Sequence, residues 1–553
     1  MKAIMKTMKY FLSMAALALV GAMTVSCSSD DNIIEQPQQP ETKNNVVTLT
    51  TTVSLGDATT RALTDGGAKT FAAGETMALV YKNTGGSTVK VVSEPLPAGD
   101  HGKSATFTFT LTDPDKEQDV TYIYPAAMAN DDGTVNYDAL NSQDGTLTSL
   151  AANLDYCTKS GAWDGGNLPT LTLENQLAIL AVTLKNEAGT SDITSSTTKL
   201  TVSDGTNTYN VTPSAAEGPI YVAIRPTTSA TINIEAINGV QGYCKTLTTK
   251  TYEANNGYPV SWKMTPATLF STIASDYTAQ DGETLYGKLG SNVKISIADG
   301  ATVTLKDVTI NGVNDGDYKW AGITCEGDAT ITLEGTNAVK GFDWTYPGIY
   351  VPENKTLTIE GEGSLNASCN GRSTGIGGGM DMHCGNIVIN GGNITATGGK
   401  YNAAGIGGGE GDDGSVTRCG KITINGGTVT ATGGNFAAGI GSGNYGASND
   451  ITINGGTVTA TGGRNGAGIG SGRGGTCGNI TISGGTVTAT GVNWAAGIGG
   501  GMTNGTCGTI TITSGVTQVT ATRGEDAPRS IGAGDEGEGI SVTIEDYDKV
   551  KQY

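Results

Sequence analysis

The C-terminal half of the chain repeats a short pattern of alternating apolar and polar residues. In "ITINGGTVTATGG", which begins at Ile451, Ile451 and Ile453 point to one side of the chain and the Thr between them to the other. Val458 and Ala460 repeat the alternation after an Asn-Gly-Gly turn, since Gly accepts positive φ and Asn tolerates it better than most residues. A short "AGIG" segment around Ile469 completes the unit. We expect two or three short strands per unit, separated by sharp corners.

The unit recurs along some 200 residues. Its Gly-Ile pair marks the register, and the Ile stands at Ile323, Ile349, Ile376, Ile406, Ile440, Ile469, Ile498 and, after a Ser in place of the Gly, Ile531. Strand units that recur at such a spacing are typical of a solenoid. Eight coils stacked at the strand spacing of about 4.8 Å would form a rod of roughly 38 Å. We therefore predict a parallel β-helix of about eight coils over residues 267–553.

One corner of the predicted coils carries amides. Asn390, Asn425 and Asn454, followed by Ser483, occupy the same position in successive coils. Stacked amides at such a corner can hydrogen-bond to one another along the rod, so we predict a structural ladder.

Cysteines occupy a second repeated position, three residues before the first Ile of the unit: Cys384, Cys419, Cys477 and Cys507, with Ser448 between the pairs. Stacked Cα atoms about 4.8 Å apart would lie within disulfide range. In-register side chains point in parallel, however, which leaves their Cβ atoms somewhat too far apart. The spacing therefore does not decide whether the disulfides Cys384–Cys419 and Cys477–Cys507 form. We favour a ladder of buried thiols.

Aromatic residues offer a candidate binding surface. They stand three to five residues before the Ile of their coils, at one corner region: Trp320, Tyr346, Tyr401, Phe436 and Trp494. An aligned row of ring faces would stack against sugar rings. Alternatively, each ring covers the core at its own corner. The coils from Ile323 to Ser364 also resemble β-helical carbohydrate-binding domains of surface proteins, and the resemblance implies glycan binding.

The region from residue 46 to 266 has longer alternating runs, at the spacing of a β-sandwich. It resembles the fimbrillin family in "TTRALTDGGAKTFAAGETMALVY" from Thr59, "YIYPAA" from Tyr122, "LPTLTLENQLAILAVTL" from Leu168 and "GYPVSWKM" from Gly257. The resemblance implies a two-part Greek-key β-sandwich, with subdomains of about 46–160 and 161–266. With the β-helix, this makes an all-β chain.

The same resemblance implies a proteolytic maturation site at Arg61. Cleavage there would remove a strand, and a neighbouring subunit's strand would fill the groove by β-augmentation. Arg61 can equally be an exposed loop residue. Because a solenoid follows the sandwich where a polymerising stalk subunit would have a donor segment, we expect an anchor, a tip or a stand-alone adhesin, with other fimbrillin subunits as possible partners.

The first 26 residues resemble a bacterial lipoprotein signal peptide. Lys2, Lys6 and Lys9 precede an apolar run that ends in small residues before Cys27. The resemblance implies acyl chains on Cys27 that hold the protein in the outer membrane. Residues 27–45 are then a flexible linker, and its "SSDDN" resembles an export tag to the cell surface, although it can also be simply a solvated linker.

Composition narrows the function. The 553 residues include 84 Gly, and 16% are charged, which fits an ordered all-β chain. The net charge is −20 with only 33 basic residues. No basic stripe is visible in the sequence, so nucleic acid and strongly acidic polysaccharides are disfavoured as partners.

Little in the sequence points to catalysis. The chain has two histidines, His101 and His383, in different predicted domains, which excludes a His-based triad and a multi-His zinc site. The segment "GGEGDDGS" matches a calcium-binding repeat once, at Asp413, but a true calcium roll would repeat it, and a solvated loop is favoured. We expect no enzyme activity, no cofactor and no metal.

Two functional hypotheses follow. The first is a non-enzymatic cell-surface lipoprotein, either an adhesin or a minor fimbrial component, whose β-helix presents a binding face to a host glycan or polysaccharide. The second is a polysaccharide-binding accessory protein, or a degenerate β-helix lyase, of a glycan-uptake system.

Overall fold

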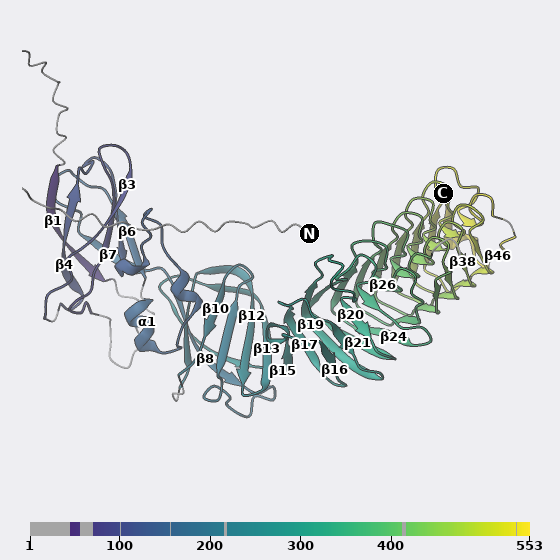
Figure 1. Cartoon of the computed structure of the whole chain (residues 1–553), viewed down its shortest axis with the longest axis horizontal. Coiled ribbons are helices and arrows are strands. Elements are labelled where there is room, and N and C mark those ends of the chain that lie inside the picture. The colour runs from purple at the N-terminus through teal and green to yellow at the C-terminus, as the bar shows by residue number, and fades with distance from the viewer. Residues whose placement is uncertain are drawn as a thin grey trace, which may run out of the picture.

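The computed structural model describes residues 45–55, 70–99, 101–154, 156–214, 218–411, 416–537 and 539–553. Cys27, Arg61 and Asp413 lie outside these residues. The described chain is almost entirely β, with sandwich-like sheets in its N-terminal half and a parallel β-solenoid in its C-terminal half, as predicted. The sheets and the solenoid follow one another in a row (Figure 1).

The first sheet curls around one apolar core. Its order is β3-β2-β5-β6-β7-β1-β4, and its strands are β1 (Val46–Leu55), β2 (Ala78–Lys82), β3 (Thr88–Val92), β4 (Ser104–Thr112), β5 (Val120–Tyr124), β6 (Cys157–Gly161) and β7 (Leu171–Asn175). Alternate residues such as Val53, Phe107 and Leu173 fill the core. Because β7 pairs with β1 and β6, the first sheet extends beyond the subdomain division that the sequence placed near residue 160.

The second part packs two sheets around a separate core. Strands β8 (Ala178–Lys185), β11 (Ile220–Ile224) and β14 (Gly257–Lys263) form one sheet, and the other includes β9 (Lys199–Ser203), β10 (Thr208–Val211), β12 (Thr227–Asn238) and β13 (Gln241–Tyr252). The short helices η2 (Ala126–Met128), η3 (Asp138–Asn141) and α1 (Leu147–Asn153) precede it. Leu140 and Leu150 contribute to its core, so the segment between β5 and β6 covers the second sandwich.

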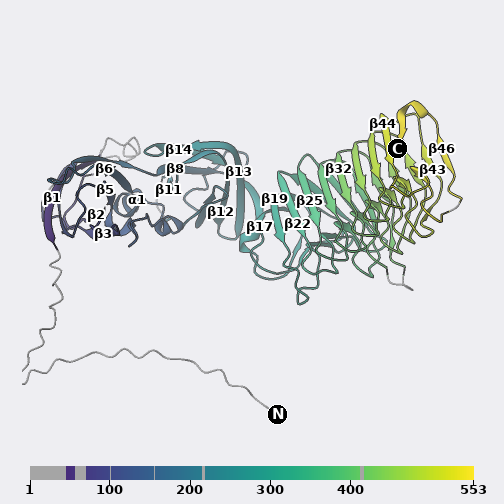
Figure 2. The ribbon, with the colours of Figure 1, turned by 90° about the horizontal axis from the view of Figure 1, so that it is seen from above.

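The second sandwich continues into the solenoid by hydrogen bonding. Strand β15 (Thr265–Leu269) pairs antiparallel with β13 and parallel with β17 (Thr284–Lys288), which belongs to the solenoid. Polar side chains join the two parts: Thr246 donates to Asp307 at 2.6 Å, and Ser271 donates to Glu235 at 2.6 Å. The solenoid therefore begins on the edge of the sandwich, as Figure 2 shows from above.

Glu235 makes this junction sensitive to pH. Burial raises the pKa of its carboxyl, so the folded state binds the proton more tightly than the unfolded state does. Stability is therefore highest below the ordinary pKa of a Glu and falls as pH rises through the raised pKa. We expect Glu235→Gln, which can still accept the bond from Ser271, to stabilise the chain at pH 7 by on the order of 1 kcal/mol.

Urea unfolding at pH 4 and pH 7 measures this effect. The gain from Glu235→Gln should shrink at pH 4, where the native carboxyl is protonated in the folded state. Glu94→Gln, which changes an exposed carboxyl of the first sandwich, serves as the control. A gain in stability of equal size at both pH values would contradict a raised pKa of the Glu235 carboxyl.

Each solenoid coil has two longer strands and a short one. The first longer strand comes from β19 (Ala301–Asn311), β21 (Ala329–Glu334), β24 (Thr356–Gly361), β27 (Asn386–Ile389), β31 (Ile422–Ile424), β35 (Ile451–Ile453), β39 (Ile480–Ile482), β43 (Ile510–Ile512) and β46 (Val542–Ile544). The second comes from β22 (Thr336–Lys340), β25 (Ser364–Ser368), β28 (Asn393–Thr397), β32 (Thr428–Thr432), β36 (Thr457–Thr461), β40 (Thr486–Thr490), β44 (Gln518–Thr522) and β47 (Val550–Gln552). Two short helices, η4 (Phe270–Thr272) and η5 (Tyr547–Lys549), lie near the ends of the solenoid.

The short strands of the coils form a ten-stranded parallel sheet: β16 (Tyr277–Ala279), β18 (Ile295–Ile297), β20 (Ile323–Cys325), β23 (Ile349–Tyr350), β26 (Ile376–Gly377), β29 (Ile406–Gly407), β33 (Ile440–Gly441), β37 (Ile469–Gly470), β41 (Ile498–Gly499) and β45 (Ile531–Gly532). Ile440 pairs with Ile469, and Ile469 with Ile498, which confirms the predicted register. Two strands precede Ile323, so the solenoid is longer than the eight predicted coils.

The predicted amide ladder is also present. Asn425 donates to Asn390, Asn454 donates to Asn425 and Ser483 donates to Asn454, each at 2.8 Å. Each amide therefore uses its oxygen towards one neighbouring coil and its nitrogen towards the other, which fixes the corner in register.

The favoured thiol ladder is wrong, because both disulfides are present. Cys384–Cys419 and Cys477–Cys507 join successive coils, with 4.4 Å between Cα atoms in each pair. The cysteines lie beside or within a sheet of two-residue strands, β30 (Arg418–Cys419), β34 (Ala447–Ser448), β38 (Thr476–Cys477) and β42 (Thr506–Cys507). The coils approach one another more closely there than the roughly 4.8 Å of a regular sheet, so the sulfur atoms can meet.

Candidate binding face

The five predicted aromatic residues fall in three neighbouring columns of the solenoid. Counted from the Ile of each Gly-Ile pair, Trp320 and Tyr346 stand three residues before it, Phe436 and Trp494 four, and Tyr401 five. Because the Ile residues stack in register, these counts place the rings in three adjacent columns rather than in one aligned row.

The rings also differ in exposure. Trp320 packs against the core, with its ring 5.9 Å from Phe342 and 5.4 Å from Tyr318, as the core-covering alternative describes. Tyr401 and Trp494 are 44% and 37% exposed. Tyr346 and Phe436 are half-buried. Tyr401 and Trp494 therefore offer the most ring surface to a ligand, and Tyr346 and Phe436 offer less.

Successive coils meet along this corner through backbone hydrogen bonds. The residue four after one Ile donates its N–H to the carbonyl of the residue four before the previous Ile, at 2.8–3.0 Å, in the pairs Met380–Thr345, Asn444–Asn402, Arg473–Phe436, Met502–Asn465 and Asp535–Trp494. We call these residues and their neighbours the corner stripe: residues 344–345, 371–372, 380–381, 401–402, 410–411, 435–436, 444–445, 464–465, 473–474, 493–494, 502–503 and 535–536.

The stripe varies where the rest of the coil is constant. The residue one after each Ile from Ile376 to Ile531 is Gly, and so is the residue three after it. The residues four before Ile349, Ile376, Ile406, Ile440, Ile469 and Ile498 are Thr345, Arg372, Asn402, Phe436, Asn465 and Trp494. The residues four after the Ile of the next coil in each case are Met380, Glu410, Asn444, Arg473, Met502 and Asp535. The core constrains the constant positions, whereas the stripe carries a different chemical group in almost every coil.

Aromatic rings and cations alternate on the stripe. The Arg372 guanidinium lies 5.3 Å from the centre of the Trp344 ring, and Lys400, beside the stripe, lies 5.5 Å from that of Tyr401. Arg372 also forms an ion pair with the buried carboxylate of Glu410 at 3.4 Å. Trp344, which is not among the five predicted aromatic residues, stands five residues before its Ile, as Tyr401 does, and is 47% exposed.

The corner stripe gathers cations that lie far apart in the sequence, together with the acidic residues Asp381, Glu410, Asp535 and Glu536. Between residues 370 and 500 the sequence has six basic residues, and three of them, Arg372, Arg464 and Arg473, lie on the corner stripe, with Lys400 beside it. Arg372, Lys400 and Arg464 are separated by 28 and 64 residues in the sequence, and only the stacking of coils brings them to one corner.

The described residues offer little for catalysis. His101 donates to the carbonyl of Pro97 at 2.9 Å, and His383 accepts a backbone N–H from Arg418 at 3.0 Å. Burial raises the pKa of Cys244 and of Cys325 to about 12, so neither thiol is a ready nucleophile. No group of three or more His, Cys, Asp or Glu side chains in the described ranges could hold a metal ion.

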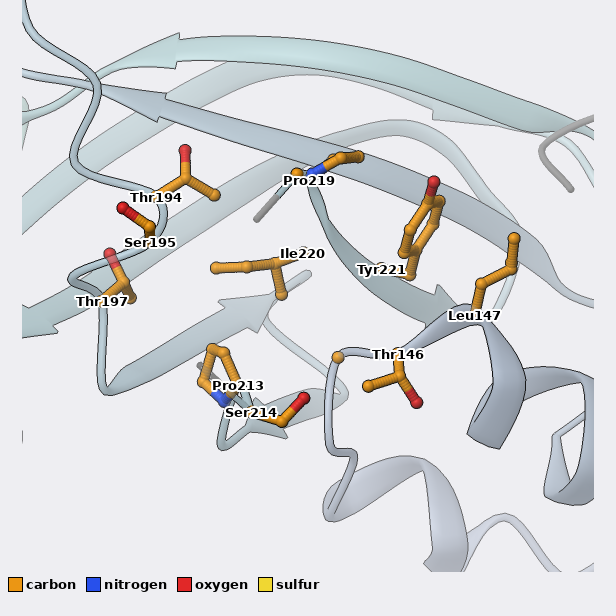
Figure 3. A pocket seen from close by; sticks show the side chains of 12 residues that line it. Thr146, Leu147, Thr194, Ser195, Thr197, Pro213, Ser214, Pro219, Ile220 and Tyr221 are labelled. Carbon is orange, nitrogen blue, oxygen red and sulfur yellow. The ribbon is translucent and has the colours of Figure 1, made fainter. Parts of the chain in front are cut away.

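The second sandwich has a small cavity of about 150 Å³ beside the start of α1 (Figure 3). Hydroxyls of Thr146 and Thr197 and the apolar side chains of Pro213 and Ile220 line it. Among its described lining residues there is no carboxylate, His or Cys, so the cavity is small, mixed in polarity and without evident reactive chemistry.

Comparisons with known proteins agree with the solenoid. A family model described as a beta helix repeat matches residues 387–410, 422–444, 451–473 and 480–502. No protein in a search of curated sequences matches the chain. Within the described ranges, none of the helices has the length and apolar character needed to cross a bilayer.

Several solved structures are similar to part of the chain. A putative cell adhesion protein from Parabacteroides distasonis is 11% identical, with a TM-score of 0.24, over 39% of this chain and 88% of its own. One from Bacteroides uniformis is 13% identical, with a TM-score of 0.24, over 41% and 94%. A truncated tip fimbrial protein from Porphyromonas gingivalis is 11% identical, with a TM-score of 0.21, over 40% and 95%.

Proposed function

We propose that this chain is a non-enzymatic cell-surface lipoprotein that acts as an adhesin or as a minor fimbrial component. One observation carries the proposal: the solenoid keeps its core and glycines constant while it varies the groups on one partly exposed corner stripe. In repeat proteins, variation confined to one face is typical of a binding surface. Exposed aromatic rings on the stripe favour a saccharide as the bound molecule, which also keeps the polysaccharide-binding accessory protein as the second candidate.

The N-terminal strand supports a role for cleavage at Arg61. Strand β1 ends at Leu55, shortly before Arg61, and pairs with β4 along Val46–Ser54. Cutting after Arg61 would separate β1 from the rest of the chain and leave β4 and β7 without this partner. The core would lose Val53 and Leu55, so another extended apolar segment could take their place.

Lipid attachment to Cys27 is tested by Cys27→Ser in the source bacterium or a related expression host. We expect the wild-type protein to incorporate labelled fatty acid and to sediment with outer membranes, because two or more acyl chains give a stable anchor. The variant should lose both properties. Membrane retention of an unlabelled Cys27→Ser protein would contradict the lipoprotein assignment.

N-terminal sequencing of the mature surface protein separates the assembly states. A start at Ala62 would support protease-triggered strand exchange. A blocked N-terminus at Cys27, with no shorter form, would favour a stand-alone adhesin.

Protease added to intact cells tests exposure at the outer face, since a periplasmic protein would stay uncut.

A further inference from the structure

We propose that Phe436, Tyr445 and Arg473 form a subsite for the acidic group of a saccharide chain that lies along the corner stripe. This inference rests on the proposed binding function of the stripe and names the chemistry of its ligand. Three kinds of observation on this part of the stripe support it: backbone conformation, the contacts of Arg473 and the distribution of charge.

Phe436 and Tyr445 occupy positions that the backbone does not favour for them. Their φ values are 62° and 52°, in the left-handed region. The residues equivalent to Phe436 in the neighbouring coils are Asn402 and Asn465, also at positive φ, and Asn tolerates this conformation. A bulky residue is strained in this conformation. Since the fold accepts Asn at this position, the ring is kept at an energetic cost to the fold.

The position of Tyr445 has left-handed backbone in several coils. It stands five residues after its Ile, where other coils have Asp381, Gly474, Thr503 and Glu536, at φ between 55° and 59°. A bulky side chain such as Tyr is uncommon in this conformation. Phe436 and Tyr445 thus stand at two left-handed positions of the same coil, and the guanidinium of Arg473 is near both rings.

Arg473 lies close to both rings. Its guanidinium carbon is 5.5 Å from the centre of the Phe436 ring and 5.5 Å from that of Tyr445. Its Nε donates to Thr503 at 3.5 Å. No carboxylate of the described chain forms an ion pair with Arg473, although the sequence has 53 acidic and 33 basic residues. A guanidinium held in place by two rings is ready to bind a carboxylate or sulfate in a bidentate manner.

Charge around the subsite favours an anion. Between residues 421 and 510 the only acidic residue is Asp450, which lies 3.8 Å from Lys421 at a different corner of the coil. The acids of the stripe lie to either side, at Asp381 and Glu410 and at Asp535 and Glu536. Arg464, which is exposed, adds a second cation in the coil between Phe436 and Trp494.

A saccharide fits the remaining groups. Trp494 stands in the same column as Phe436, two coils further, or about 10 Å at the strand spacing of about 4.8 Å. The spacing between coils is close to the length of one sugar unit in an extended chain. Sugar rings can then stack on Phe436 and Trp494 while an acidic group reaches Arg473, and the exposed amide of Asn435 can bond hydroxyls.

The test compares the full chain with the double variant Phe436→Asn/Tyr445→Asn and with Arg473→Gln. The probes are polygalacturonate, which carries carboxylates, dextran sulfate, which carries sulfates, and neutral dextran. We expect wild type to bind at least one anionic probe at least tenfold more tightly than dextran, less so at high salt. Both variants should weaken this binding tenfold or more. Tyr547→Asn, which changes an exposed ring near the solenoid end, should not.

Thermal unfolding separates binding from support of the fold. The double variant introduces the residue type that neighbouring coils already use at the first position, so its melting temperature should stay unchanged or rise. A clear fall in melting temperature, with binding lost only in proportion to unfolding, would show that the rings cover the core. Undiminished binding by Arg473→Gln, or dextran bound as tightly as the anionic probes, would overturn the proposal.

Adhesion of cells that display the same variants distinguishes this subsite from the broader function. If wild type binds none of the probes, but adhesion is lost in the double variant, the ligand chemistry is wrong and the binding function of the stripe stands. If adhesion is absent from wild type, or is unchanged when the whole solenoid stripe is altered, the proposed function fails.

Discussion

Replacing Gly470 by Ala is expected to cost about 4 kcal/mol or more, one of the largest losses for a single substitution in the solenoid. Gly470 has φ +137°, and an added Cβ would lie 2.0 Å from the carbonyl oxygen of Gly499 in the next coil. The oxygen belongs to the backbone of a paired strand and cannot move without breaking the stack. The same conformation recurs in Gly377, Gly407, Gly441, Gly499 and Gly532, with φ between 126° and 134°.

Gly282→Ala is the matched control for this prediction. Gly282 also has positive φ, +80°, but an added Cβ would meet no atom within 4 Å. Its loss should therefore be only the backbone penalty of about 1 kcal/mol. Urea unfolding followed by circular dichroism measures both variants. Equal losses for Gly470→Ala and Gly282→Ala would mean that the contact between coils, as opposed to backbone conformation, contributes nothing.

Removing both disulfides is expected to lower the stability of the solenoid by about 4 kcal/mol for each bond. The bonds close segments of 35 and 30 residues, and each restricts the unfolded chain by that loop. The variants Cys384→Ser/Cys419→Ser and Cys477→Ser/Cys507→Ser are suitable because Ser448 occupies the same column between the two pairs. Serine therefore fits this corner without repacking.

Unfolding with and without dithiothreitol tests this prediction. Wild type in reductant should become as unstable as the variant that lacks both bonds, and that variant should be insensitive to reductant. If wild type keeps its full stability after complete reduction, confirmed by thiol counting, the bonds do not constrain the unfolded chain as described.

The repeated part of the fold was predictable because one residue type recurs at one place. Stacked Ile residues and the Asn390–Asn425–Asn454 ladder follow from the spacing alone, since every coil must present the same groups to its neighbour. The first coils, in strands β16 and β18, have no Gly-Ile pair and were therefore missed. The first coils are joined to the sandwich through β17, which pairs with β15, and this continuity is a tertiary feature.

The candidate site was less accessible to sequence reasoning. The positions three, four and five residues before the Ile form three separate columns, but the prediction treated them as one region. Trp320, which covers the core, was therefore grouped with the exposed Trp494. Arg473 lies 37 residues from Phe436 in the sequence, and only the stacking of successive coils brings the two side chains together. The disulfides form because the coils approach one another closely at one corner, and the spacing of the repeats in the sequence does not give this distance.

The constancy of the solenoid core has a consequence for how this protein can diversify. Each coil offers the same upper and lower surface, so duplication of one unit, such as residues 451–479, would insert a coil that its neighbours accept. Every such copy lengthens the rod by about 4.8 Å and adds new positions to its outer corner. Those positions are free to mutate because the core does not depend on them. Gene duplication within the repeat can therefore generate new specificities without any redesign of the scaffold.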